Sequence, residues 1–123
     1  MNDSSFSINQ RTMVSPDRQI NFVSTSLTYV FRQVEGPGAP QDIVLRGDQF
    51  IIGRSKTSDI VIGSIELSRR HMVLRKEGAE YVIEDLDSQN GVYLNGLRIH
   101  SAVLRGGDTI HVGEVAFLYL EGM

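Results

Sequence analysis

Residues 53–96 read GRSKTSDIVIGSIELSRRHMVLRKEGAEYVIEDLDSQNGVYLNG. Three polar pieces follow one another in this stretch: Gly53-Arg54-Ser55, then Ser68-Arg69-Arg70-His71, then Asn90 to Gly96. The runs between them are short and rich in apolar and β-branched residues, and Gly, Asn, Asp or Ser bounds many of them. This pattern is typical of short strands joined by polar turns. The stretch therefore predicts a β-structure with three polar loops.

The rest of the chain continues the strand pattern. No segment sustains the i, i+3, i+4, i+7 apolar spacing of an amphipathic helix, so the sequence predicts an all-β fold, an antiparallel β-sandwich. The run at 115–120 is almost wholly apolar, and we expect it to be covered on both faces. The predicted strands are 27–31, 42–45, 49–52, 59–62, 71–76, 80–86, 92–94, 97–99, 109–112 and 115–120.

The chain divides into two parts of different character. Residues 1–26 are polar and serine-rich, with apolar side chains too scattered to show a period, and we interpret them as an N-terminal extension or tail, flexible or docked. Residues 27–123 are expected to form one domain, because 123 residues suit a single core without disulfide or metal support.

Composition narrows the class of protein. The chain has no cysteine, which excludes a disulfide framework and a thiolate nucleophile and suits a reducing compartment. No apolar run approaches the roughly 18 residues of a membrane span, and the N-terminus lacks the blocks of a signal peptide. We therefore expect a cytoplasmic protein that does not bind a membrane.

Charge is distributed unevenly. The net charge is −3, yet residues 51–80 hold six basic and four acidic side chains. One basic patch on an acidic domain favours a small anionic target over nucleic acid, because a long polyanion requires many neutralising contacts. We expect no nucleic-acid partner.

Arg54 and Ser68 suit binding of a phosphate. A guanidinium is planar, always charged and matched to two phosphate oxygens at once. A loop hydroxyl can donate to another phosphate oxygen, as can a backbone N–H in a concave loop. The alternatives are a surface arginine after a glycine turn and a serine that caps a turn.

An enzyme is not expected. Ser68 and His71 are three residues apart, but no G-x-S-x-G motif accompanies them and no third residue orients the imidazole. The acidic run at 84–87 suggests a loop rather than an acid/base pair, with Asp87-Ser88 shaping the turn through side-chain to backbone bonds. The remaining histidines, His100 and His111, have no ligand-like partner, so we expect no metal and no cofactor.

The three polar pieces, in this order and spacing, resemble the phosphothreonine-binding loops of the forkhead-associated (FHA) domain family. The late segment 104–113 matches the family's L-x-x-G-D-x-I-x-x-G pattern, so the resemblance spans about residues 27–120. It implies a β-sandwich of about eleven strands whose loops at one end bind a phosphothreonine peptide.

The resemblance also implies roles for individual residues. In the family, the matching histidine braces the loop, and the matching asparagine holds the backbone of the bound peptide with its side-chain amide. Gln89 stands where many members have Thr or Ser. Independently of the resemblance, Asn and Gly tolerate positive φ, so we expect turn-making alone from Asn95-Gly96, Gly91 and Gly113. The implied phosphopeptide-binding residues are Arg54, Ser68, Arg69, Gln89 and Asn90, and the implied structural residues are Gly53, His71, Gly91, Asn95 and Gly96.

The resemblance implies a signalling module that binds a phosphothreonine-containing protein or peptide downstream of a Ser/Thr kinase. The ligand could also be the chain's own tail, where Thr12 and Thr25 are candidate phosphosites. The alternative is a degenerate FHA domain that acts as a structural or interaction module without phosphate. Arg54, Ser68 and Asn90 favour phosphate binding over that alternative.

Overall fold

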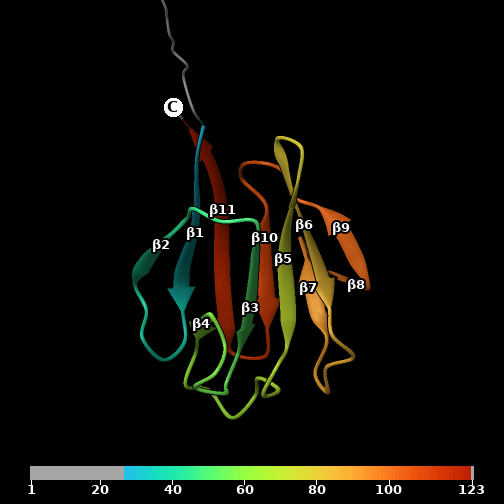
Figure 1. Ribbon diagram of the computed structural model, residues 1–123. Coiled ribbons are helices and arrows are strands. Elements are labelled where there is room, and N and C mark those ends of the chain that lie inside the picture. The colour runs from blue at the N-terminus through green and yellow to red at the C-terminus, as the bar shows by residue number, and fades with distance from the viewer. Residues whose placement is uncertain (1–26, 123) are drawn as a thin grey trace, which may run out of the picture.

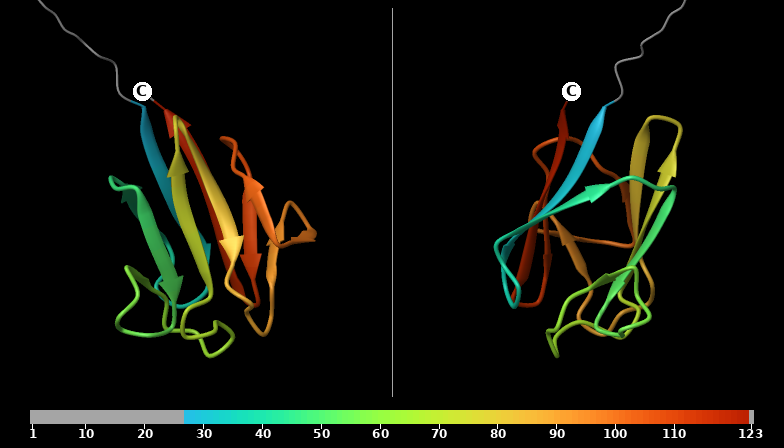
Figure 2. Two further views of the ribbon diagram at one scale, coloured as in Figure 1. Left: turned by 45° about the vertical axis from the view of Figure 1, so that its right-hand side comes forward. Right: turned by 60° about the vertical axis from the view of Figure 1, so that its left-hand side comes forward.

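A computed structural model describes residues 27–122, in which eleven strands and no helix occur. No helix that could cross a membrane is therefore found in this part of the chain. The strands form two sheets that face each other, as Figures 1 and 2 show. The predicted all-β sandwich of about eleven strands is confirmed. The strands are β1 (Thr28–Glu35), β2 (Gln41–Leu45), β3 (Gln49–Gly53), β4 (Ile60–Val61), β5 (Met72–Glu77), β6 (Glu80–Asp85), β7 (Val92–Leu94), β8 (Leu97–Ile99), β9 (Ser101–Val103), β10 (Thr109–Val112) and β11 (Val115–Gly122).

The two sheets differ in size and order. One has six strands in the order β2-β1-β11-β10-β7-β8, and the other has five in the order β4-β3-β5-β6-β9. The short β4 pairs parallel with β3, while the other pairings with a defined register are antiparallel. Most of the sandwich is thus built from hairpins and neighbouring antiparallel strands.

Alternating side chains of the two sheets make the core. Phe31 of β1 stacks on Phe117 of β11 with ring centroids 4.3 Å apart, and Tyr29 meets Tyr81 edge-on at 5.1 Å. These four rings are buried. Full burial of a large apolar side chain stabilises a fold by about 1.5–3 kcal/mol, so this aromatic centre contributes much of the stability.

The strand β11 differs from its prediction. Phe117 and Tyr119 are fully buried between the sheets, but Leu118 and Leu120 are only half-buried on the outer face. An apolar run was expected to be covered on both faces. Within residues 27–122 the outer face of β11 is thus only partly covered, so the expectation was wrong for that face.

Two strand predictions also change. The strand β9 was not predicted, because it has only three residues, two of them exposed, and it pairs with β6 alone. The first strand continues to Glu35 instead of ending at residue 31, since β1 pairs along most of its length with β2 and β11.

Three of the connecting loops and the start of β1 lie at opposite ends of the sandwich. The loops β3–β4, β4–β5 and β6–β7 lie at the lower end in Figure 1, beside the β10–β11 turn. Leu27, where β1 is about to begin, lies at the opposite end, next to the end of β11. The first two polar pieces of the sequence and the start of the third, at Asn90, therefore meet at the end of the sandwich farthest from residue 27.

Candidate functional site

A pocket of about 240 Å³ lies between these three loops. Arg54 comes from the β3–β4 loop, Ser68 from the β4–β5 loop and Asn90 from the β6–β7 loop. The structure thus brings together all five residues predicted to bind a phosphopeptide. The pocket is lined by Arg54, Ile65, Glu66, Leu67, Ser68, Arg69, Gln89 and Asn90.

The first two loops are joined through their backbones. The Arg54 N–H donates to the Ser68 carbonyl at 3.0 Å, and the Ser55 N–H donates to the Arg69 carbonyl at 3.1 Å. A Cβ on Gly53 would lie 2.1 Å from the Arg69 carbonyl oxygen. Residue 53 must therefore lack a side chain for the loops to approach this closely.

Arg54 is exposed and is anchored at one nitrogen. Its Nε donates to the Leu67 carbonyl at 3.2 Å. No described residue accepts a hydrogen bond from its two Nη groups. The guanidinium is thus oriented by the scaffold while its outer edge stays available to an anion.

The Ser68 hydroxyl is oriented in a similar way. Its Oγ accepts the Gln89 N–H at 3.1 Å, which links the second loop to the third. Because the oxygen acts as an acceptor in this bond, its own hydrogen remains free to donate. The Gln89 side chain is exposed at the pocket.

His71 joins the second and third loops from beneath. The imidazole is fully buried; its Nδ1 accepts the Ser68 N–H at 2.9 Å, and its Nε2 lies 2.9 Å from the Gly91 carbonyl oxygen. Since Nδ1 accepts, the proton sits on Nε2 and the ring is neutral. Burial lowers the pKa of His71, against the opposing effects of the Gly91 carbonyl and Asp85.

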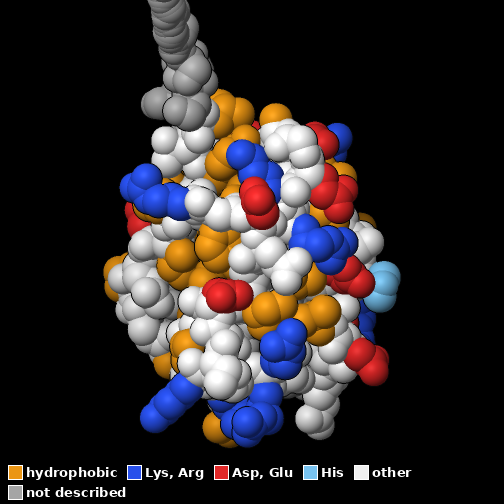
Figure 3. Space-filling view, viewed as in Figure 1, with side chains coloured by type: hydrophobic (Ala, Val, Ile, Leu, Met, Phe, Trp, Pro, Cys, Tyr) orange, Lys and Arg blue, Asp and Glu red, His pale blue; other side chains and the backbone are white. Residues whose placement is uncertain are grey.

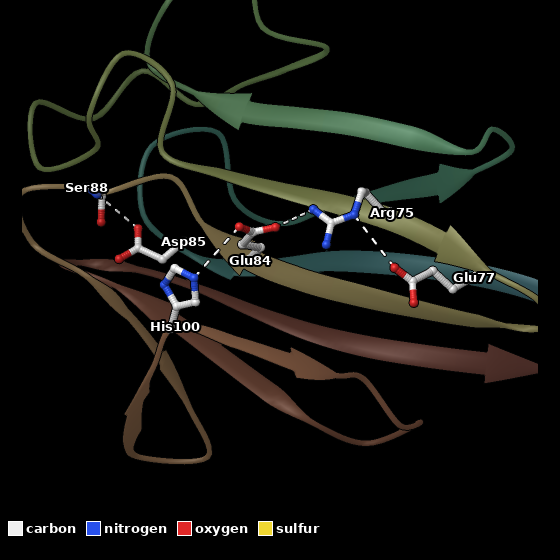
Figure 4. Close-up of polar contacts among 6 residues, drawn as sticks. All are labelled: Arg75, Glu77, Glu84, Asp85, Ser88 and His100. Atoms are coloured by element: carbon white, nitrogen blue, oxygen red, sulfur yellow. Dashed lines mark hydrogen bonds and ion pairs between the residues drawn. The ribbon is translucent and has the colours of Figure 1, made fainter.

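The loop that carries Asn90 is shaped by two side chains. The Asp85 carboxylate accepts the Ser88 N–H at 3.1 Å, drawn in Figure 4, and the Ser88 hydroxyl accepts the Gly91 N–H at 2.9 Å. The prediction that Asp87-Ser88 shapes this loop through side-chain to backbone bonds is therefore confirmed for Ser88 and wrong for Asp87, because Asp85 supplies the carboxylate. Asp87 contributes a left-handed backbone with φ of 58° instead.

The side-chain amide of Asn90 is bonded to the protein through its nitrogen, while its oxygen is not bonded to any described residue. Its Nδ2 donates to the Glu66 carbonyl at 2.7 Å. None of the described residues donates to its Oδ1. The amide oxygen is therefore free to accept an N–H from a bound chain.

A clasp that the sequence did not predict holds the second loop; it consists of Ser64, Glu66 and Glu114. The Glu66 N–H donates to Ser64 Oγ at 3.1 Å, Ser64 Oγ donates to Glu114 Oε2 at 2.7 Å, and the Glu114 N–H donates to Glu66 Oε1 at 2.6 Å. A Cβ on Gly113 would lie 2.2 Å from Glu66 Oε1. Gly113, at φ of 57°, thus makes room for the clasp as well as the turn, so the turn-only expectation was incomplete.

The other predicted turn residues lie elsewhere. Asn95 and Gly96 form the β7–β8 turn with φ of 50° and 87°, and neither lines the pocket. The Asn95 Oδ1 accepts the Thr109 N–H at 2.9 Å, which ties this turn to β10. Gly91, at φ of 81°, lies under the Arg98 side chain.

The acidic run beside the site is occupied by structural contacts. Glu84 pairs with Arg75 and lies 3.8 Å from His100 Nε2, and Arg75 also faces Glu77 at 3.8 Å (Figure 4). No group of three or more His, Asp or Glu residues is arranged to hold a metal within residues 27–122.

The field around the pocket is positive. Arg54, Lys56, Arg69 and Arg70 are all exposed in the first two loops. Figure 3 shows Lys and Arg side chains gathered at the lower end of the molecule, where these loops lie. A pocket with fixed donors and surplus positive charge is suited to an anion.

A second pocket of about 260 Å³ lies at the opposite end, between the start of β1, the β2–β3 loop and the end of β5. Leu27, Arg46 and Lys76 are among its lining residues. It contains none of the predicted site residues.

Comparisons with known proteins agree with this geometry. The glycogen accumulation regulator GarA of Mycolicibacterium smegmatis is 37% identical over 87 residues, which cover 71% of this chain and 55% of GarA. The chain thus spans little more than half the length of this curated relative. Among solved structures, Mycobacterium tuberculosis EmbR in complex with a low-affinity phosphopeptide matches with a TM-score of 0.72 at 30% identity, covering 77% of this chain and 24% of EmbR.

A structure from a study of phosphothreonine-dependent FHA domain interactions matches with a TM-score of 0.69 at 26% identity, covering 76% of this chain and 95% of that one. The family model for the FHA domain matches residues 50–113, which include all three loops of the pocket. The chain therefore belongs to the forkhead-associated (FHA) domain family.

Proposed function

We propose that this chain binds phosphothreonine-containing peptides reversibly, as a reader in a Ser/Thr kinase pathway. One observation carries the proposal: the oriented guanidinium of Arg54, the hydroxyl of Ser68 and the amide of Asn90 meet in one exposed pocket. The same proposal assigns the binding domain to residues 27–123 and locates the protein in the cytoplasm.

Each residue has a distinct part in this proposal. The two Nη groups of Arg54 bind phosphate oxygens, and the Ser68 hydroxyl donates to another. Asn90 Oδ1 accepts a backbone N–H of the peptide, while Arg69 and Gln89 offer further polar contacts at the rim. A hydrogen bond to a charged group contributes about 1.5–3 kcal/mol, so losing one should weaken binding by an order of magnitude or more.

The residues that hold the three loops together also support the proposal of phosphopeptide binding. Gly53, His71 and Gly91 hold the three loops against one another before any ligand arrives. A preformed pocket avoids part of the ordering cost of binding. We assign Asn95 and Gly96 the structural role of shaping the β7–β8 turn, away from the ligand.

Binding without catalysis fits the chemistry of the pocket. His71, the imidazole nearest Ser68, is buried and uses both ring nitrogens in structural hydrogen bonds. Neither nitrogen is placed to take a proton from the Ser68 hydroxyl, which itself accepts a backbone N–H. His71 therefore does not serve Ser68 as a general base.

The relatives support a signalling role. EmbR has been solved in complex with a low-affinity phosphopeptide, and GarA is a glycogen accumulation regulator. A second source of ligand is the chain's own N-terminal segment, since a tethered phosphothreonine reaches an effective concentration of order millimolar. Thr12 and Thr25, the candidate phosphosites, lie outside the described residues.

Calorimetric titration tests the proposal. A phosphothreonine peptide should bind and its unphosphorylated twin should not, and Arg54→Ala should abolish measurable binding with little change in melting temperature. Arg46→Ala, an exposed arginine at the opposite end, is the matched control and should bind normally. Equal heats for the two peptides would support the degenerate, phosphate-independent module instead.

A further inference from the structure

The direction of the Asn90 side chain depends on one backbone carbonyl. Within residues 27–122 the amide nitrogen of Asn90 has one hydrogen-bond partner, the Glu66 carbonyl oxygen, at 2.7 Å. This bond fixes which way the amide oxygen points, and that oxygen is the acceptor assigned above to the peptide backbone. The Asn90 acceptor is therefore aimed correctly only while the Glu66 carbonyl stays in place.

The clasp of Ser64, Glu66 and Glu114 holds that carbonyl. Residues 64–67 form a turn in which the Leu67 N–H donates to the Ser64 carbonyl at 3.1 Å and the Glu66 N–H donates to Ser64 Oγ at 3.1 Å. The Glu66 side chain is exposed, so packing in the core does not fix it. Glu114 ties this turn to the β10–β11 turn at two points, because its carboxylate accepts the Ser64 hydroxyl at 2.7 Å and its N–H donates to Glu66 Oε1 at 2.6 Å.

Arg54 is supported differently, although its anchor is the next carbonyl along the chain. Its Nε donates to the Leu67 carbonyl, and the Leu67 side chain is 1% exposed in the core. Ser68, which follows, is held by its own bond to His71. Loss of the clasp should therefore disturb the Asn90 amide and leave the Arg54 guanidinium in place.

We infer that Glu114, on the β10–β11 turn, is a positioning residue for phosphopeptide binding that acts through Ser64 and Glu66 on the side-chain amide of Asn90. The inference rests on the proposed function, since it concerns the same site. Glu114 itself does not line the pocket. Its effect on affinity is thus transmitted through the clasp and not through contact with the ligand.

The sign of the effect separates positioning from charge. Glu114 is exposed and adjoins a basic pocket, so removing its negative charge should by electrostatics alone strengthen the binding of an anion. Glu114→Ala also removes the acceptor of the Ser64 hydroxyl and should weaken binding. Glu114→Gln removes the same charge but keeps an oxygen that can accept that hydroxyl. We therefore expect Glu114→Gln to bind at least as tightly as the native chain.

The contribution of Asn90 sets the size of the loss. Losing one hydrogen bond between neutral groups weakens binding by about two- to tenfold. Asn90→Ala and Glu114→Ala should each fall in this range, with the loss in Glu114→Ala no larger than the loss in Asn90→Ala. In a chain that already carries Asn90→Ala, the further change Glu114→Ala should cost no affinity, because the clasp then has no amide to orient.

A double-mutant cycle on the whole chain tests the inference. Fluorescence anisotropy with one phosphothreonine peptide would give the affinities of the native chain, the three single variants and the double variant. Glu80→Ala is the matched control, since Glu80 is exposed at the start of β6, outside the pocket, and its replacement removes the same charge. This control should bind as the native chain does. Circular dichroism of each variant would confirm that it retains its fold.

Nuclear magnetic resonance of the chain without peptide tests the positioning by itself. The side-chain amide signals of Asn90 should move in Glu114→Ala and stay near their native positions in Glu114→Gln. The Nε–H signal of Arg54 should stay in place in both variants, because the Leu67 carbonyl is supported by the core.

The outcomes separate this inference from the proposed function. Native or tighter binding by Glu114→Ala would overturn the inference, as would an equal loss with and without Asn90, or unmoved Asn90 amide signals in Glu114→Ala. If Asn90→Ala binds as tightly as the native chain, the part given to Asn90 and the effect of the clasp on affinity are both refuted. If phosphorylation of the peptide gives no gain in affinity, the proposed function fails, while the signals of the free chain still decide whether Glu114 positions Asn90.

Discussion

Replacing His71 with alanine tests how the loops of the pocket are held together. The imidazole bridges the Ser68 N–H and the Gly91 carbonyl, each at 2.9 Å, and no part of it reaches solvent. The substitution leaves a donor and an acceptor without partners inside the protein. It should therefore act on stability and on the geometry of two binding loops together.

The two partners set the magnitude. An unsatisfied buried polar group costs about 1–3 kcal/mol, so the two groups left by His71→Ala should lower the free energy of unfolding by about 2–6 kcal/mol. For a domain of this size each kilocalorie corresponds to several degrees, and we expect the melting temperature to fall by roughly 10 °C or more. Peptide affinity should fall as well, because Ser68 and Gly91 are no longer held.

The pH dependence carries a definite sign. Burial lowers the pKa of His71 in the folded chain, so the unfolded chain binds the extra proton more readily. The stability due to neutral His71 is complete above the unfolded pKa of about 6.5 and is lost as the pH falls from there toward the folded pKa. The loss can reach about 1.4 kcal/mol per pH unit in that window.

Urea unfolding followed by circular dichroism is the suitable assay, because the chain has no tryptophan. The stability gap between the native chain and His71→Ala should be largest at pH 7.5 and should narrow toward pH 5.5. His100→Ala is the matched control, since His100 is exposed and lies 3.8 Å from Glu84. If the two free energies of unfolding differ by less than about 0.5 kcal/mol at pH 7.5, or if their difference does not decrease toward pH 5.5, His71 does not hold the loops together as described.

Two further predictions concern the backbone and the N-terminal segment. Gly53→Ala should lower the free energy of unfolding by several kcal/mol and abolish measurable peptide binding, because the new Cβ would lie 2.1 Å from the Arg69 carbonyl oxygen. Calorimetry of unfolding and of peptide binding should show neither loss for the control Gly63→Ala, where no atom lies within 4 Å of the new Cβ. A phosphate on Thr25 should be bound only by a second copy, because the length of β1, about 26 Å, separates Leu27 from the pocket end of the sandwich, and the two residues from Thr25 to Leu27 are too short to reach back over that distance. A phosphate on Thr12 is followed by about 50 Å of chain before Leu27 and can bind in cis. Sedimentation should therefore show concentration-dependent dimers of the chain phosphorylated on Thr25 and monomers of the chain phosphorylated on Thr12. Dimers of both chains, or of neither, would contradict this prediction.

Much of the fold follows from local sequence chemistry. Strands such as β5 and β6 were predicted because short apolar runs, 72–74 and 81–83, are followed by polar and turn residues. The strand β9 escaped prediction because it has three residues and owes its existence to pairing with β6. Short edge strands are defined by a partner, and a sequence window does not contain that partner.

The candidate site divides in the same way. The five pocket residues were predicted because the three polar pieces resemble a known family. The clasp of Ser64, Glu66 and Glu114 was not, because it joins residues 48 and 50 positions apart with no local motif. The prediction for Asp87 was wrong for a similar reason. The backbone conformation after β6 places the Asp85 carboxylate, and not that of Asp87, at the Ser88 N–H, and the sequence alone does not give that conformation.

Mapping the bound peptide by nuclear magnetic resonance tests the central claim most directly. Titration of the isotope-labelled chain with a phosphothreonine peptide should shift the backbone amides of Arg54, Ser68 and Asn90. The amides of Arg46 and Lys76, in the pocket at the opposite end, should stay in place. The unphosphorylated peptide should move neither set. Shifts centred on Arg46 and Lys76, or equal shifts with both peptides at the loops, would contradict phosphate recognition by this pocket.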